Sequence, residues 1–225
     1  MEAEHVLAER LAMVDGEIAD AARAAGRDPA ELTRIVVTKF HPAELVRRLV
    51  RLGVRDVGEN RHQEAAAKAA ELSDLDVRWH FVGQLQSNKA KAVRAYARAV
   101  HSVDRASLAD ALAGSSPLDV FIEVNLTGDA ARGGVDPELL EPLAERVLST
   151  PGLVLRGVMA VAPLGEEPRA AFARVRTASE ALQRLAPEAG AISAGMSGDF
   201  REAVLEGATH LRIGTAITGK RPTHG

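Results

Sequence analysis

The first strand-like segment of the chain reads RIVVTKFHP and covers residues 34–42. The run from Ile35 to Thr38 is rich in β-branched residues, which is typical of a strand buried in a sheet. Lys39 follows this run directly, and Pro42 opens a helical pattern that continues to residue 52. A strand followed at once by a helix is the unit from which parallel sheets are built.

The same strand–helix unit recurs along the chain, after an opening amphipathic helix in residues 1–26. Eight such units in 225 residues predict an α/β fold, a closed (β/α)8 TIM barrel formed by a single domain over residues 1–225 with an extra N-terminal helix. An open doubly wound sheet is the alternative, although the Gly-rich fingerprint of dinucleotide-binding sheets is missing. The strands are expected near 34–38, 54–57, 78–82, 99–103, 119–124, 153–161, 191–194 and 210–213, and the helices between them near 42–52, 60–72, 87–97, 105–113, 136–149, 167–186 and 198–206.

Several polar residues are expected to cap these helices, because their side chains can accept hydrogen bonds from the first free N–H groups. The expected N-caps are Asn60, Ser87, Asp104, Asp136 and Ser197.

The composition excludes several classes of protein. The formal net charge of −3 gives no global field that would recruit nucleic acid or an anionic membrane. No apolar run approaches the roughly 18 residues of a membrane span, and no signal peptide is recognisable, so a cytoplasmic location is expected. The chain has no cysteine, which excludes disulfides and thiolate chemistry, and its seven histidines lack metal-ligand spacing. A basic helical face formed by Lys89, Lys91, Arg94 and Arg98 is interpreted as solvated.

The predicted barrel gathers chemistry at one end, because the active sites of such barrels lie at the carboxyl ends of the strands. Lys39 stands at the first of these ends and has two interpretations. The lysine could simply extend to solvent. Alternatively, an apolar surround or nearby cations could release its proton, and the free amine could then attack an aldehyde. The residues at the eight ends are Lys39, Glu59 with Asn60, Gly83, Asp104, Asn125, Met159, Met196 with Ser197, and Arg212 to Thr215.

Two late segments suit phosphate binding. AGMSGDF, residues 194–200, follows the seventh strand, and LRIGTAITG, residues 211–219, contains the eighth. Phosphate sites of (β/α)8 barrels are frequently built from the loops after these two strands. Arg212 supplies a cation at the same end, or else an ion pair across the barrel. An aldehyde-reactive lysine together with a phosphate cradle predicts pyridoxal 5'-phosphate as the ligand.

Five motifs in order carry a resemblance to a known family: VVTKFHP, VGENRHQE, WHFVGQLQSNK, GMSGDF and RIGTAITG. Over residues 34–219 the chain resembles the pyridoxal phosphate homeostasis proteins (the YggS/PROSC family), which have the fold of the alanine racemase N-terminal barrel. The resemblance implies that Lys39 holds the cofactor as a covalent aldimine and that Arg212 faces the pyridine nitrogen. It further implies phosphate contacts from Ser197, Gly214 and Thr215 and from the backbone near Met196 and Gly198, with Asn60 and His80 near the ring.

The resemblance also implies a function without robust catalysis: an intracellular carrier or buffer of pyridoxal phosphate. Apo-enzymes that need the cofactor are candidate recipients, no catalytic residue is assigned, and a monomer is expected. A pyridoxal phosphate-dependent amino-acid racemase is the alternative, but the racemases have a second domain with a catalytic tyrosine, whereas Tyr96 is expected in a helical stretch away from the strand ends. A Schiff-base aldolase would use the same lysine and cradle. Phe40 and His41 depart from the family pattern, in which a polar residue often follows the lysine.

Overall fold

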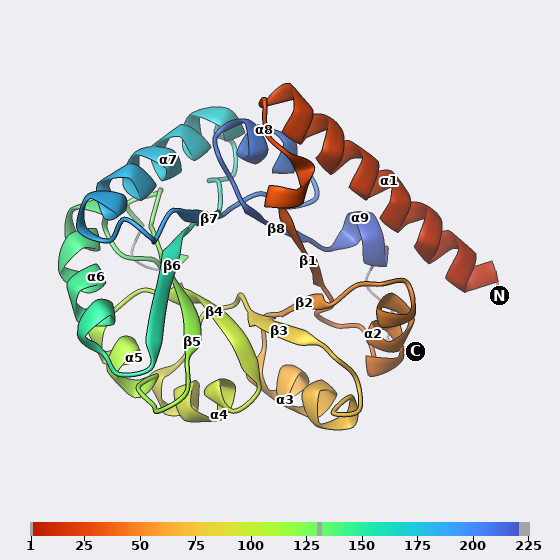
Figure 1. The fold of residues 1–225 in the computed structure, drawn as a ribbon, viewed down its shortest axis with the longest axis horizontal. Helices are drawn as coiled ribbons and strands as arrows, with labels where there is room; N and C mark the ends of the chain where they lie inside the picture. Colours follow the sequence, from red (N-terminus) through yellow and green to blue (C-terminus); the bar gives the residue numbers. More distant parts are fainter. Residues whose placement is uncertain (1, 130–131, 221–225) are drawn as a thin grey trace.

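The computed structural model describes residues 2–129 and 132–220 and shows a closed, all-parallel barrel with strand order β1 to β8 (Figure 1). Closure through the β1–β8 pair confirms the predicted (β/α)8 barrel and excludes the open sheet. The strands are β1 Thr33–Val37, β2 Asp56–Glu59, β3 Arg78–Phe81, β4 Ala97–Val103, β5 Leu118–Glu123, β6 Leu153–Met159, β7 Ala191–Ser193 and β8 His210–Ile213.

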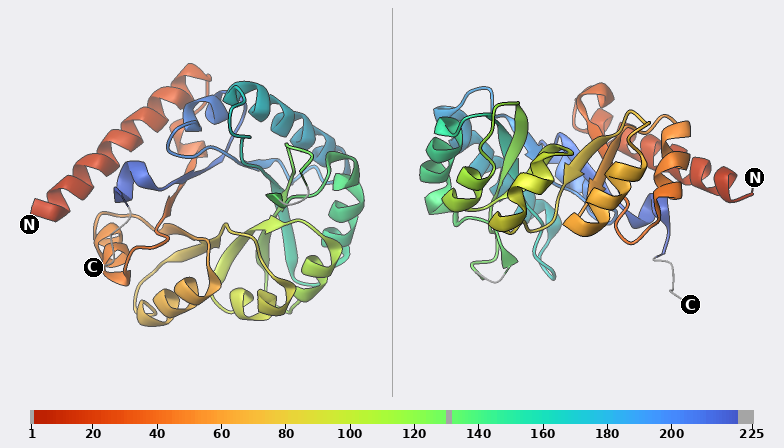
Figure 2. Two further views of the ribbon diagram at one scale, coloured as in Figure 1. Left: turned by 180° about the vertical axis from the view of Figure 1, so that it is seen from behind. Right: turned by 90° about the horizontal axis from the view of Figure 1, so that it is seen from below.

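Helices surround the barrel and cover the outer face of the sheet (Figures 1 and 2). Each expected helix is present, although the one predicted for 87–97 is reduced to a 3-10 turn and five α-helical residues. The helices are α1 Glu2–Ala24, α2 Ala43–Arg51, α3 His62–Glu71, α4 Ala90–Arg94, α5 Ala106–Ala111, α6 Leu140–Ser149, α7 Pro168–Leu185, α8 Phe200–Leu205 and α9 Thr215–Thr218, with 3-10 turns η1 Pro29–Glu31, η2 Ser87–Lys89 and η4 Pro137–Leu139.

The extra N-terminal helix is confirmed, and it lies along the outside of the barrel next to α8 and α9 (Figure 1). Its apolar residues recur every three or four positions, so they form one stripe that faces the barrel. The stripe is buried and consists of Leu7, Leu11, Val14, Ile18 and Ala22. The helix therefore extends the hydrophobic core instead of standing free.

Of the five expected N-caps, only Asp136 is confirmed, and its carboxylate accepts from Glu138 N at 3.0 Å. The others were wrong because the helices begin one or two residues away and use backbone positions without a capping side chain. The observed N-caps of η2, α3, α5 and α8 are Gln86, Arg61, Arg105 and Asp199.

The register between strands decides which side chains enter the barrel. Ile35 pairs with Arg212, and Val37 pairs with Gly58, so these residues share one face of the sheet. The aromatic rings of Phe121 and His101 lie on that face and stack with centroids 4.3 Å apart. Because successive side chains alternate between faces, every second residue of each strand points into the barrel.

Candidate functional site

Lys39 lies in a turn directly after β1, at the carboxyl end of the barrel, and is exposed. The next residue, Phe40, has φ +67°, a left-handed conformation that is rare for a bulky side chain. Helix α3 holds this turn from one side: Phe40 N donates to Glu64 Oε2 at 3.1 Å, and the Arg61 guanidinium lies 5.0 Å from the centre of the Phe40 ring. Of these two contacts, only that of Arg61 involves the aromatic ring, and it favours Phe40 where a polar residue was expected.

A buried ion pair lies beneath the same turn. Lys68 Nζ, on α3, is 2.6 Å from Glu59 Oε1 at the end of β2, and it also donates to the Thr38 carbonyl at 2.9 Å. The Thr38 hydroxyl donates to the same Glu59 oxygen at 2.6 Å. Burial raises the pKa of Glu59, and the Lys68 ammonium opposes that shift. The residue before Lys39 is thus anchored by two groups in the protein interior.

Sequence reasoning missed Lys68, although the sequence carried a signal for it. Lys68 continues the buried stripe of α3 between Ala65 and Leu72, at helical spacings of three and four residues. A lysine on an apolar stripe must have a partner, and Glu59 ends the strand that precedes this helix.

Arg212 lies inside the barrel on β8 with only 5% of its surface exposed. Nη1 donates to the Ser193 carbonyl at 2.6 Å and to Ser193 Oγ at 2.8 Å, and Nη2 donates to the Ala160 carbonyl at 2.9 Å. Burial lowers the pKa of Arg212 to about 10, opposed by the Glu123 carboxylate. The guanidinium therefore keeps its charge at neutral pH and is held mainly by neutral oxygens.

The loops after β7 and β8 meet, as the sequence predicted. Ser197 Oγ accepts from Ala216 N at 3.3 Å, so Ser197 joins the two loops and does not cap α8. Gly214 packs against β1, where a Cβ would lie 3.7 Å from the Val37 carbonyl oxygen. Since Val37 precedes Lys39 by two residues, this loop and the lysine share one part of the mouth.

The remaining residues of the expected cradle surround that junction. Thr215 and Gly198 are exposed, and a Cβ on Gly198 would meet open space. Met196 is 39% exposed, but its backbone N–H already donates to Asp199 Oδ1 at 2.6 Å. Gly195 has φ +91°, and a Cβ there would lie 2.9 Å from Phe200 Cα, so only glycine lets α8 pack this closely.

The two residues expected near the cofactor ring, Asn60 and His80, lie at different depths in the barrel. Asn60 lies at the mouth under Gly83, whose Cβ would lie 2.2 Å from the Asn60 carbonyl oxygen, and Asn60 Oδ1 is buried without a hydrogen-bond partner. His80 lies deeper, because its Nε2 reaches Asp56 at the amino end of β2, while its Nδ1 is engaged by His101. Glu123, on β5, has a buried Oε2 without a partner, and burial raises its pKa to about 7.

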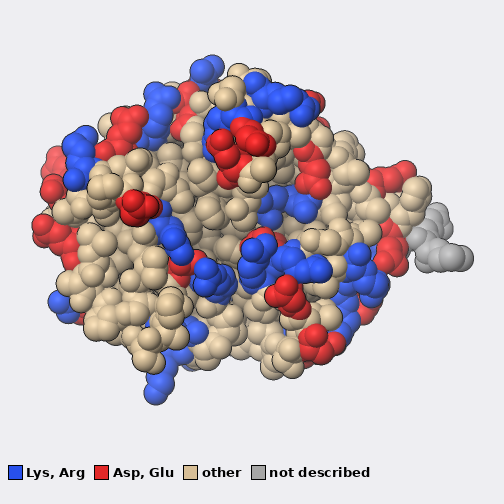
Figure 3. Space-filling view, in the orientation of Figure 1, with Lys and Arg blue, Asp and Glu red and all other residues tan. Residues whose placement is uncertain are grey.

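Other expectations concern residues outside this mouth. Tyr96 lies in the turn between α4 and β4, not in a helix, and its hydroxyl is 3.5 Å from His62 Nδ1. Arg94, assigned to a solvated face, donates to the Leu112 carbonyl at 2.8 Å, and Arg98 pairs with Asp119 at 3.1 Å. Basic and acidic side chains are interspersed on the face seen in Figure 3.

The described residues offer neither a metal site nor a membrane-spanning helix. No group of three or more His, Cys, Asp or Glu residues is arranged to hold a metal ion within residues 2–129 and 132–220. Over the same part of the chain, no helix combines the length and apolarity needed to cross a membrane.

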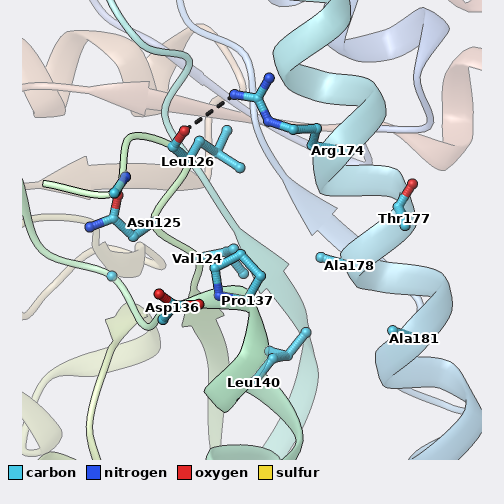
Figure 4. A pocket seen from close by; sticks show the side chains of 12 residues that line it. Val124, Asn125, Leu126, Asp136, Pro137, Leu140, Arg174, Thr177, Ala178 and Ala181 are labelled. Atoms are coloured by element: carbon cyan, nitrogen blue, oxygen red, sulfur yellow. Dashed lines mark hydrogen bonds between the residues drawn. The ribbon is translucent and has the colours of Figure 1, made fainter.

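A separate cavity of about 610 Å³ lies between α7 and the segment from β5 to α6 (Figure 4). Ala178 and Ala181 face it from α7, Leu140 faces it from α6, and Arg174 at its edge donates to the Leu126 carbonyl. None of the residues that the sequence assigned to pyridoxal phosphate lines this cavity. Asn125, which follows β5, is the one strand-end residue of the predicted mouth that lines the cavity.

Comparison with known families gives consistent matches over nearly the whole chain. The family described as alanine racemase, N-terminal domain, matches residues 20–222. A pyridoxal phosphate homeostasis protein from Pseudomonas aeruginosa is 46% identical over 223 residues, which is 96% of each chain. A protein of the same description from Aquifex aeolicus is 40% identical over 225 residues, covering 95% of this chain and 97% of that one.

Solved structures agree with these sequence matches. PipY from Synechococcus elongatus, in a structure with pyridoxal phosphate bound, is 39% identical with a TM-score of 0.82, over 95% of this chain and all of that one. Alanine racemase from Corynebacterium glutamicum shares the fold with a TM-score of 0.71 at 15% identity, over 99% of this chain and 63% of that chain.

Proposed function

The chain belongs to the pyridoxal phosphate homeostasis protein family and matches the alanine racemase N-terminal domain, and on this premise we propose that it binds pyridoxal 5'-phosphate. In this proposal it carries or buffers the cofactor in the cytoplasm and releases it to apo-enzymes, without robust catalytic turnover. The observation that carries the proposal is the adjacency of β1 and β8, since Lys39 follows one strand and Arg212 and Gly214 stand at the end of the other.

The donors and acceptors at the mouth fit this ligand. The buried Oδ1 of Asn60 and Oε2 of Glu123 have no hydrogen-bond partner within the described protein, so both suit a polar ligand. The junction between Ser197 and Ala216 offers small residues and exposed backbone, which suit a phosphate group. Lys39 is exposed at the same mouth, where its amine can reach an aldehyde.

Each residue has a role in the proposal. Lys39 would form a covalent bond between its amine nitrogen and the aldehyde carbon of the cofactor, with loss of water. Lys68 cannot easily replace it, because its ammonium is buried against Glu59. The phosphate contacts are assigned to Ser197, Gly198, Gly214, Thr215 and the backbone of Met196, and the ring contacts to Asn60 and Arg212, with His80 acting on the ring through the residues that hold Arg212.

Arg212 supports a binding role more than catalysis. When bound, the cofactor would supply an electron-withdrawing ring that stabilises carbanions, and it does so best with a protonated pyridine nitrogen. A charged guanidinium beside that nitrogen keeps it unprotonated, so the ring is a weaker electron sink. Tyr96, next to His62 of α3, is no evident second base for the racemase alternative. We also propose that the chain acts as a single domain and as a monomer.

The decisive experiment is reconstitution of the purified apo-protein with pyridoxal phosphate, followed by absorbance spectroscopy. Borohydride reduction and peptide mass spectrometry should locate the cofactor on Lys39. Lys39→Ala should lose the visible absorbance band but keep weaker binding through the phosphate. Lys91→Ala, which changes an exposed lysine of α4, is the matched control and should behave like the wild type. A reduced adduct on Lys68, or no binding by the wild type, would refute the proposal.

A second measurement separates carrier from racemase. Exchange of the α-hydrogen of D- and L-alanine in deuterium oxide should be negligible, whereas mixing the loaded protein with an apo-enzyme should restore that enzyme's activity. Fast exchange would contradict the carrier role and favour the racemase.

A further inference from the structure

A chain of hydrogen-bonded polar side chains crosses the interior of the barrel. Asp56 Oδ1 lies 2.9 Å from His80 Nε2, and His80 Nδ1 lies 2.9 Å from His101 Nε2. His101 Nδ1 lies 2.8 Å from Ser193 Oγ, which accepts from Arg212 Nη1 at 2.8 Å. These five residues, here called the interior chain, come from β2, β3, β4, β7 and β8.

The interior chain runs from the base of the barrel to the residue nearest the mouth. Asp56 is the first residue of β2 and lines a groove with Arg55 and Arg78 at the amino end of the strands. Its side chain is 14% exposed, whereas His101 and Ser193 are fully buried. Polar groups in such an interior are costly unless every donor finds an acceptor, so the arrangement of their hydrogens is strongly constrained.

The two ends of the interior chain select the same arrangement of hydrogens. The Asp56 carboxylate only accepts, so His80 Nε2 carries a proton and, in a neutral ring, His80 Nδ1 accepts. His101 Nε2 then donates to His80, which leaves His101 Nδ1 as an acceptor. From the other end, Arg212 donates to Ser193 Oγ, and the Ser193 hydroxyl is free to donate to that same His101 Nδ1. With both rings neutral, each of the four hydrogen bonds in the interior chain has one donor and one acceptor, and every donor points toward the Asp56 end.

The surroundings of His101 favour the neutral ring that this arrangement needs. Burial lowers its pKa well below the usual value, and the positive charge of Arg212 acts in the same direction. Its ring is stacked on Phe121 on the remaining side. At Asp56, burial would raise the pKa, but the hydrogen bond with His80 and the neighbouring positive charge, that of Arg78 included, together outweigh it and the pKa is lowered, so the carboxylate is ionised at neutral pH.

We propose that Asp56, His80, His101 and Ser193 are positioning residues that hold the Arg212 guanidinium in one orientation toward the ligand at the mouth. The inference rests on the proposed function, in which Arg212 faces the pyridine nitrogen of pyridoxal phosphate. The interior chain links a buried cation to a carboxylate at the far end of the barrel through aligned hydrogen bonds. Arg212 itself stays protonated, so the interior chain orients it and passes no proton through it.

The first test needs no cofactor. Nitrogen-15 NMR of the histidine rings in the ligand-free protein at pH 7 distinguishes the two neutral tautomers and the charged form. His80 and His101 should both be neutral with the proton on Nε2, with signals assigned through His80→Gln and His101→Gln. A proton on Nδ1 of either ring would overturn the proposal.

The second test measures the effect on the ligand. Ser193→Ala should allow the His101 ring to adopt its other tautomer. It should also weaken binding of pyridoxal phosphate by about fivefold or more, since one hydrogen bond to the Arg212 guanidinium is lost. Ser193→Thr, which keeps the hydroxyl, should restore both. The matched control is Ser102→Ala, because Ser102 is equally buried on β4 but its hydroxyl has no partner within the described residues.

The outcomes separate this inference from the proposed function. If the wild type binds pyridoxal phosphate and Ser193→Ala binds it as tightly as Ser102→Ala does, the positioning role is refuted while the proposed function stands. If the wild type binds no pyridoxal phosphate, both fall. If Ser193→Ala alone weakens binding and shifts the His101 signal, the inference is supported.

Discussion

Replacing Lys68 with methionine tests the buried ion pair beneath the Lys39 turn. The substitution keeps a long apolar side chain but removes the ammonium that lies 2.6 Å from Glu59 Oε1 and 2.9 Å from the Thr38 carbonyl. The side chains of the two partners are only 9% and 1% exposed, so water cannot replace the lost contacts. Breaking a buried pair in this way costs about 3 kcal/mol or more.

This cost should depend on pH in a defined direction. Lys68 opposes the effect of burial on the Glu59 carboxyl, so its removal raises the pKa of Glu59 further. A raised pKa in the folded state gives stability that is present below the unfolded value and is lost as the pH rises through the folded value. The loss caused by Lys68→Met should therefore be smaller at pH 5 than at pH 8.

Urea denaturation of the ligand-free protein measures both effects. Thermal denaturation at neutral pH gives a second readout, in which the melting temperature should fall by roughly 6–12 °C, since about 3 kcal/mol is lost from a chain of this size. Lys91→Met on the exposed surface of α4 is the control, with an expected change within about 0.5 kcal/mol. Adding Glu59→Gln to Lys68→Met should recover more than about 1 kcal/mol. A loss below about 1 kcal/mol, or one that is equal at pH 5 and pH 8, would refute the reasoning.

Two further predictions concern stability. Gly157→Ala places a Cβ 1.7 Å from the Ala191 carbonyl oxygen between β6 and β7, and it should lower the free energy of unfolding in urea by at least about 2 kcal/mol. Gly16→Ala in α1 is the control, because its Cβ meets nothing within 4 Å, and it should raise the free energy of unfolding by about 0.5–1 kcal/mol. Similar values for both variants would contradict the steric argument. Burial, with a further contribution from His80, lowers the pKa of His210 to about 4, so its contribution to stability is present above pH 6.5 and is lost as the pH falls. His210→Gln should remove about 2–3 kcal/mol of the stability lost between pH 7 and pH 4.5, and an unchanged pH profile would count against this account.

The order of strands and helices could be read from the sequence because it depends on local patterns. Each β-branched run and each helical stripe is visible within about ten residues, and eight repeats leave few ways to close a sheet. The placement of Lys39 at a strand end and of two glycine-containing loops after β7 and β8 followed from that order alone. Helix starts were less predictable, since Asn60 and Ser197 could cap a helix or make a tertiary contact, and local sequence does not distinguish the two.

The partners inside the barrel were decided only by the tertiary structure. Alternation along a strand shows which side chains point inward, but not which of them meet, because that depends on the stagger between eight strands. His80 and His101 are adjacent only because β3 and β4 pair in this register, and Ser193 joins them from β7 across the interior. Lys39 was visible in the sequence as a charge after an apolar strand, whereas the ion pair between Lys68 and Glu59 and the hydrogen bonds to Arg212 form only once the barrel has closed.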